Sequence, residues 1–146
     1  MKIIALLFSI TLFLNPAINW LTDFEKAKAE ASVSKKNILL NFSGSDWCIP
    51  CIKMKKEVFE SASFQKYAEK NLVLMKADFP RLKKNQLDAA LLKNNESLAA
   101  KYNKKGVFPL TVLLNANGKV LKTWEGYPKI NADDFIKQMQ LSTNAR

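Results

Sequence analysis

Apolar residues in the first third of the chain change from helical to strand-like spacing. Between residues 20 and 32 there are apolar residues at 20, 21, 24, 27 and 31, which is close to the spacing of one helix face. Thr22 or Asp23 is the expected N-cap, because both side chains accept hydrogen bonds from free backbone N–H groups. Residues 37–42 form a short apolar run after two lysines, and this run predicts a buried strand.

A turn over residues 43–46 leads into a second helical pattern, which begins at Trp47 or Cys48 and ends near residue 60. Pro50 suits the first turn of this helix, where its missing N–H costs nothing. A further helical piece over 61–70 follows, with Ser61 or Ser63 as its cap, and residues 72–77 predict the next strand.

The second half of the chain predicts one insertion, a hairpin and two helices. Residues 81–95 are mostly polar and form an insertion with some helix, and a short helix over 95–102 begins at Asn94 or Asn95. The strands 110–114 and 120–124 flank an Asn-Gly turn, and a last helix over 132–141 is capped by Asn131.

This order of elements predicts an α/β fold with a mixed central sheet between layers of helices. Two parallel strands need a crossover, which the helix after residue 48 provides, whereas the Asn117-Gly118 turn makes the last two strands antiparallel. The expected architecture is therefore an α/β/α sandwich.

The first 19 residues differ from the rest. Met1-Lys2 is a basic start, residues 3–14 are apolar apart from Ser9 and Thr11, and Pro16 then breaks the run. This layout is typical of a secretory signal peptide, and the run is short for a membrane span, which needs roughly 20 residues. An uncleaved anchor or a buried first helix is the alternative. We expect a signal peptide or N-terminal hydrophobic segment over 1–19, one domain over 20–146, and an exported, periplasmic or otherwise extracytoplasmic protein.

The composition is that of a globular protein with a basic surface. Lys and Arg number 23 against 13 acidic residues, which gives a formal charge of +10. The lysines are spread along the chain and no nucleic-acid motif accompanies them, so we expect no nucleic-acid partner. A solvated basic surface explains this charge, and such a surface favours acidic partners. Membrane association is expected only through an uncleaved N-terminal segment, and the protein is expected to be a monomer.

The chain has two cysteines, Cys48 and Cys51, at C-x-x-C spacing. A structural zinc site needs about four Cys or His ligands, and the sequence has no histidine and no other cysteine, so no metal is expected. A purely structural disulfide is a second interpretation, but a bridge closing so short a loop adds little stability. A redox pair accounts for more, because C-x-x-C after a strand and at a helix start is a thioredoxin-like pattern. There Cys48 is expected to be exposed and activated by the helix N-terminus, and Cys51 more buried.

The segment Trp47-Cys48-Ile49-Pro50-Cys51 resembles the active site of the thioredoxin superfamily, and within it bacterial exported thioredoxin-related proteins. Phe108-Pro109 is similar to the family loop that carries a cis-proline facing the disulfide. The resemblance implies a thioredoxin-like domain with Cys48 and Cys51 as catalytic residues. It further implies that Trp47, Pro50, Phe108 and Pro109 support the site or contact substrate, and that no cofactor is bound.

Two features depart from the family pattern. The family's buried Asp before the motif corresponds best to Asn41, which cannot act as a base, so proton transfer needs water or another acid such as Asp46 or Glu57. The dipeptide Ile49-Pro50 has its proline before the second cysteine, as in reducing members, and the absent histidine argues against a strong oxidant.

The expected function is therefore a thiol:disulfide oxidoreductase that reduces or exchanges protein disulfides outside the cytoplasm. Its expected partners are protein thiols and disulfides and an unidentified redox partner. The alternative is a non-catalytic adaptor that uses the Trp47 and Phe108 surface for binding. A peroxidase of the same fold is a minor alternative, because the chain has few arginines to surround a peroxidatic thiol.

Overall fold

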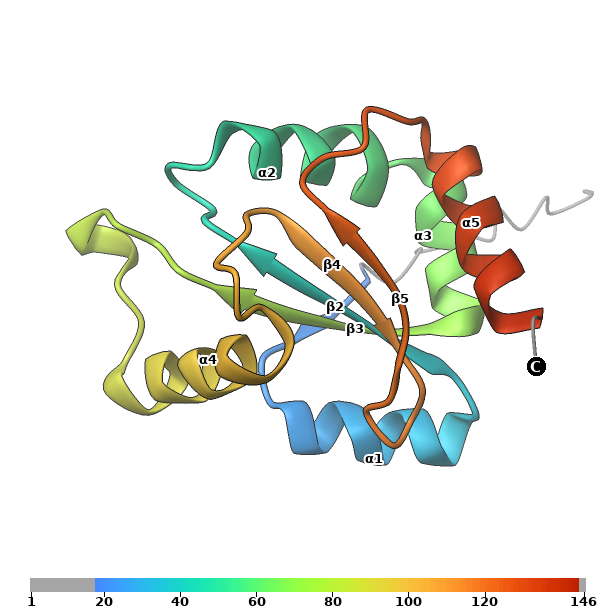
Figure 1. Ribbon diagram of the computed structural model, residues 1–146, viewed down its shortest axis with the longest axis horizontal. Helices are drawn as coiled ribbons and strands as arrows, with labels where there is room; N and C mark the ends of the chain where they lie inside the picture. Colours follow the sequence, from blue (N-terminus) through green and yellow to red (C-terminus); the bar gives the residue numbers. More distant parts are fainter. Residues whose placement is uncertain (1–17, 145–146) are drawn as a thin grey trace, which may run out of the picture.

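The computed structural model describes residues 18–144, which form a five-stranded sheet with helices on both faces (Figure 1). In chain order the elements are β1 (Trp20–Leu21), α1 (Phe24–Ser34), β2 (Asn37–Ser43), α2 (Ile49–Met54), the π-helical turn η1 (Lys55–Phe59), α3 (Ala62–Asn71), β3 (Leu72–Asp78), the 3-10 turn η2 (Lys83–Asn85), α4 (Ala89–Tyr102), β4 (Leu110–Leu114), β5 (Val120–Glu125) and α5 (Ala132–Asn144).

The sheet is mixed, in the order β1-β3-β2-β4-β5. Strands β1, β3 and β2 are parallel, β4 is antiparallel to β2, and β5 is antiparallel to β4. The crossover from β2 to β3 contains α2, and Gly118 has the positive φ of 79° that the β4–β5 turn requires. Both predicted connections, and the α/β/α architecture, are confirmed.

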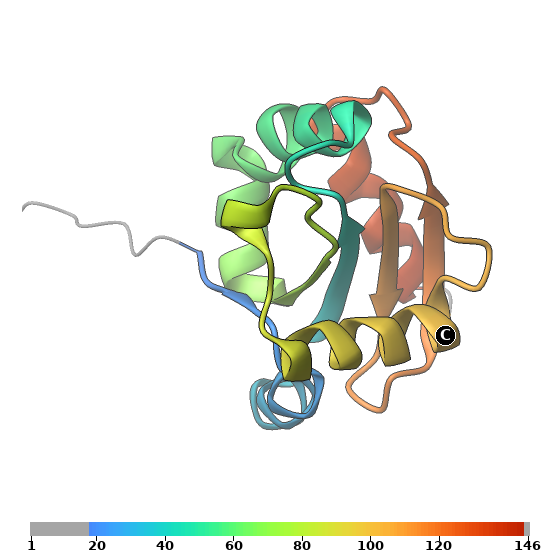
Figure 2. The same ribbon diagram turned by 90° about the vertical axis from the view of Figure 1, so that its left-hand side faces the viewer.

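Each face of the sheet has its own apolar core. On one face α2, η1, α3 and α5 cover a cluster rich in aromatic rings, whereas α1 and α4 cover the opposite face, as the two views show (Figures 1 and 2). Consecutive strand residues alternate between the cores, so Leu39 belongs to the first while Ile38 and Leu40 belong to the second. β2 is therefore buried on both sides, as its continuous apolar run predicts.

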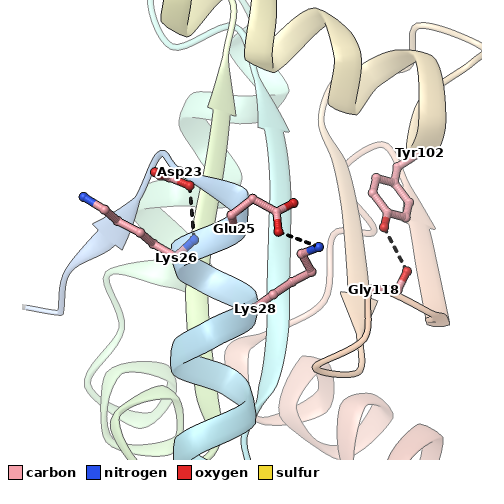
Figure 3. Close-up of polar contacts among 6 residues, drawn as sticks. All are labelled: Asp23, Glu25, Lys26, Lys28, Tyr102 and Gly118. Atoms are coloured by element: carbon pink, nitrogen blue, oxygen red, sulfur yellow. Dashed lines mark hydrogen bonds and ion pairs between the residues drawn. The ribbon is translucent and has the colours of Figure 1, made fainter.

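For the helix predicted over 20–32, the expected cap at Asp23 is confirmed, whereas the residues placed in the helix before this cap are wrong. Trp20 and Leu21 form the edge strand β1, which pairs in parallel with Leu74 and Met75 of β3. The helix begins only at Phe24, since the Asp23 carboxylate accepts the Lys26 N–H at 3.1 Å (Figure 3). Helical spacing in the sequence did not distinguish the two apolar residues before this cap from residues of the helix itself.

The region 81–102 also differs from its prediction. A single helix, α4, replaces the expected short one, and its N-cap is Asp88, whose carboxylate accepts the Leu91 N–H at 2.9 Å. Asn95 is not a cap: it is buried inside α4 and donates to the Asp78 carbonyl at 2.9 Å. The helix predicted over 47–60 likewise divides into α2 and η1.

Other predicted helix starts are confirmed. Ser61 accepts the Phe64 N–H at 3.2 Å, and Asn131 accepts the Asp134 N–H at 2.8 Å. The Tyr102 hydroxyl at the end of α4 donates to the Gly118 carbonyl at 2.8 Å, which ties α4 to the β4–β5 turn (Figure 3). Nearby on α1, Lys28 pairs with Glu25 at 2.8 Å.

The predicted signal segment falls mainly on residues 1–17, which lie outside the described part of the chain. Signal cleavage, export and a domain starting at residue 20 therefore remain predictions. Within residues 18–144, no helix has the length and apolar character needed to cross a membrane.

Candidate active site

Cys48 and Cys51 form a disulfide at the N-terminus of α2, with an S–S distance of 2.04 Å. Cys48 is the N-cap residue, and its sulfur accepts the backbone N–H of Cys51 at 3.3 Å. Pro50 lies in the first turn, as predicted. A sulfur that accepts an N–H at a helix N-terminus is favoured as a thiolate once the disulfide opens, because the donor and the helix dipole both stabilise negative charge.

The expected difference in exposure between the two cysteines is wrong for the disulfide form. Cys48 and Cys51 are each 4% exposed. Cys48 directs its sulfur to the helix N-terminus, where it caps α2. Ile49 is 67% exposed, so it forms the outer surface of this turn.

Trp47 is held on several sides next to the disulfide. Its indole N–H donates to the Phe79 carbonyl at 2.7 Å, the Arg81 guanidinium carbon lies 3.7 Å from its ring centre, and the Phe108 ring meets it edge-on at 5.6 Å. Gly44 lies against the indole, and a Cβ there would be 2.3 Å from the ring. Trp47 is half-buried, so it is neither a pure core residue nor a free surface group.

Asp46 fastens the segment after β3 to the active-site turn. Its carboxylate accepts the backbone N–H groups of Arg81 and Leu82 at 2.9 and 3.0 Å, and the Asn85 side-chain amide at 3.0 Å. The Arg81 N–H in particular holds the pKa of Asp46 below its ordinary value of 3.8, with further help from Asn85 and Leu82. Asp46 is thus a structural clamp that places Arg81 over Trp47.

We expect Asp46→Asn to lose part of the acid sensitivity of folding. The folded-state pKa of Asp46 is depressed, so its contribution to stability is complete above the unfolded-state pKa and disappears as pH falls through the folded-state pKa. Unfolding temperatures measured from pH 6 to pH 2 should therefore fall less steeply in the variant, which should also be less stable than the wild type near neutrality. Parallel profiles at every pH would contradict this role.

A short loop presents Phe108 and Pro109 to the site. Asn103, buried at the end of α4, donates to the Val107 carbonyl at 2.8 Å and accepts the Val107 N–H at 2.9 Å, which fixes the loop. The Phe108–Pro109 peptide bond is cis, as the family resemblance implied. Phe108 lines the same surface groove as Ile49 and Pro50, whereas Pro109 is buried.

Behind the disulfide, Asn41 and Cys51 line one pocket of about 280 Å³. The Asn41 amide donates to the Thr111 hydroxyl at 2.9 Å, so the position expected for the family's acid carries an amide fixed by β4. The acids predicted as substitutes do not line this pocket. Asp46 accepts hydrogen bonds from its three donors. Glu57 accepts a hydrogen bond from the Tyr127 hydroxyl, and this bond raises the pKa of Tyr127.

The sequence interpretation missed three charged residues that line the pocket with Cys51. They are Lys55, Lys76 and Asp78. Lys55 follows Cys51 by four residues on a helix, a spacing that places both on one face and could have identified it. Lys76 is paired with Asn41 across the parallel β2–β3 register, which only strand pairing reveals. Asp78 accepts the backbone N–H of Ser45 at 2.9 Å and so supports the active-site turn.

No metal-binding group was found within residues 18–144: no three His, Cys, Asp or Glu side chains gather there. The candidate site consists of the Cys48–Cys51 disulfide, the aromatic rings of Trp47 and Phe108 and the charged pocket behind Cys51.

Comparison with known proteins finds a matching family and named relatives of the chain. A family model described as Thioredoxin-like matches residues 19–116. The chain is 36% identical over 98 residues to a Chlamydia pneumoniae protein named disulfide bond reductase DsbH, covering 67% of this chain and 57% of that protein. It is 31% identical over 99 residues to the thioredoxin-related protein DsbJ of the same organism, covering 68% of this chain and 28% of that protein. The matches thus span less than two thirds of either relative.

Solved structures agree on the fold. A structure titled DsbH Oxidoreductase superposes with a TM-score of 0.80 and 28% identity, covering 97% of this chain and 96% of that one. A putative disulphide-isomerase from Bacteroides thetaiotaomicron superposes with a TM-score of 0.61 and 23% identity over 89% of this chain and 94% of its own, which shows likeness of fold alone.

Proposed function

Because the chain belongs to the thioredoxin-like family, we propose that it is a thiol:disulfide oxidoreductase that acts on protein disulfides through Cys48 and Cys51. The observation that carries the proposal is the Cys48–Cys51 bond at the start of α2, with the Cys48 sulfur accepting the Cys51 N–H. A helix N-terminus lowers the pKa of a capping thiol and increases its thiolate fraction, and the thiolate is the species that attacks disulfides.

The reaction proceeds in two exchange steps. In the reduced protein the Cys48 thiolate attacks one sulfur of a substrate disulfide, so a mixed disulfide forms and the other substrate sulfur leaves as a thiolate. The Cys51 thiolate then attacks the Cys48 sulfur, which forms the Cys48–Cys51 bond and releases the second substrate thiolate. Two electrons pass to the substrate, and a dithiol partner must return two electrons to the protein.

The surrounding residues have supporting roles. Trp47, kept in place by Gly44 and Arg81, excludes water from one side of the sulfur pair and offers an apolar contact. Phe108 and Pro50 present apolar surface beside the cysteines. Because an amide cannot accept the Cys51 proton, we assign that transfer to solvent in the pocket behind Cys51, where the Lys76 ammonium favours a thiolate. The Asp78 carboxylate in the same pocket already accepts hydrogen bonds from Ser45 and from the Phe79 N–H.

We propose that the reaction takes place outside the cytoplasm and that the protein reduces substrate disulfides. The apolar N-terminal run supports export, and stable disulfide substrates occur in oxidising compartments. Reduction is supported by the Ile49-Pro50 dipeptide, by the absence of histidine and by the name of the Chlamydia relative, a disulfide bond reductase.

The experiment is an insulin reduction assay with dithiothreitol as electron source. We expect catalytic amounts of the protein to accelerate precipitation of the insulin B chain well above the rate with dithiothreitol alone. Equal rates with and without the protein would contradict the proposal.

A further inference from the structure

A groove beside the disulfide is lined by three segments that are distant from one another in the sequence. It has a volume of about 240 Å³ and is lined by Ile49, Pro50, Lys53, Phe108, Gly126, Tyr127 and Lys129. The first three belong to α2 and the last three to the β5–α5 connection, which passes beside α2 in both views (Figures 1 and 2). Ile49 and Pro50 separate the two cysteines in the sequence, so a chain lying in this groove also lies next to the disulfide.

Apolar surface makes up the part of the groove nearest the cysteines. Ile49 is largely exposed, Pro50 is exposed, and Phe108 is half-buried. Exposed apolar residues gathered at one place mark a contact site rather than ordinary surface. This part suits an apolar side chain of a bound segment.

Positive charge flanks this apolar part. Lys53 lies one turn beyond Pro50 on α2, and Lys129 belongs to the β5–α5 connection. Within residues 18–144, the ion pairs are those of Lys28, Lys55 and Lys105, so neither groove lysine has an acidic partner, and no carboxylate lines the groove. The neighbouring Glu57 instead accepts the Tyr127 hydroxyl.

We propose that Lys53 and Lys129 select substrate segments that carry an acidic residue close to the disulfide cysteine. The proposal rests on the oxidoreductase function and adds the substrate class. An anionic side chain in the groove meets two unpaired ammonium groups, whereas a cationic one is repelled by both. Solvent-exposed charge pairs are individually weak, so two of them correspond to a preference of about two- to tenfold.

The test uses three peptides, each joined by a disulfide to the same reporter thiol and identical except for Glu, Gln or Lys two positions from the cysteine. We expect kcat/KM for reduction by the wild-type protein to rank Glu above Gln above Lys, with about a two- to tenfold difference between the Glu and Gln peptides. This difference should shrink at high salt, because screening weakens exposed charge interactions.

The variant Lys53→Gln/Lys129→Gln should reduce the three peptides at similar rates, because the groove then carries no charge that distinguishes Glu from Lys. The matched control is Lys26→Gln/Lys66→Gln, which removes the same charge from exposed positions on α1 and α3 and should keep the ranking. Equal wild-type rates on all three peptides, or a ranking that persists in the groove variant, would overturn the inference while leaving the oxidoreductase function intact. Failure of the wild-type protein to reduce any peptide would overturn both.

Discussion

Cys48→Ser should reduce insulin no faster than dithiothreitol alone. Serine keeps the N-cap hydrogen bond but cannot form the mixed disulfide with which exchange begins. The expected loss is therefore complete, whereas changes around the sulfur pair should only modify the rate. The measurement is the B-chain precipitation rate at equal protein concentration.

Cys51→Ser is the matched variant, because it keeps the attacking sulfur and removes only the resolving one. It should form a mixed disulfide with a target protein that persists on a non-reducing gel, whereas Cys48→Ser should not. The disulfide closes a loop of only four residues, so its loss should leave both variants folded, as circular dichroism can establish. Insulin reduction by Cys48→Ser at the wild-type rate would assign the chemistry to another group.

Phe135→Ala should lower the free energy of unfolding by about 3 to 5 kcal/mol, the usual cost of emptying a fully buried phenylalanine site. Phe135 of α5 is 0% exposed, and its ring lies 4.7 Å from that of Trp124 and 6.4 Å from that of Phe64. The ring thus joins α5 to both β5 and α3. The total free energy of unfolding of a domain of this size is about 5 to 15 kcal/mol, so the variant would lose a large share of its stability.

Urea unfolding of the oxidised protein measures this change as a lower midpoint with an unchanged slope. Leu141→Ala is the control on the same helix, because Leu141 is well exposed and its truncation should change stability by no more than about 0.5 kcal/mol. A Phe135→Ala midpoint equal to that of the control would show that the aromatic cluster is not a main source of stability.

Local chemistry explains which features the sequence predicted. The C-x-x-C pair at a helix start, the Asn-Gly hairpin and the caps at Ser61 and Asn131 each depend on residues only a few positions apart. Their hydrogen bonds form within one turn, so spacing alone indicates them.

The features that the sequence did not predict depend on distant partners. Trp20 and Leu21 form a strand because they pair with the edge of β3. Asp46 became a clamp rather than a proton acceptor because the segment after β3 brings three donors to it. Lys76 lies opposite Asn41 because of the register in which β2 and β3 pair. Residue types do not specify such pairings before the sheet is assembled.

The central claim is that the Cys48–Cys51 pair is a working redox pair, and its equilibration with glutathione buffers tests this most directly. After quenching, thiols can be alkylated and the reduced fraction measured by mass. We predict reversible titration of both cysteines together, with a potential nearer the thioredoxin end, about −270 mV, than the oxidising end near −120 mV. A potential near the oxidising end would contradict the assignment as a reductase, and a pair that never equilibrates would leave a binding adaptor as the function of this fold.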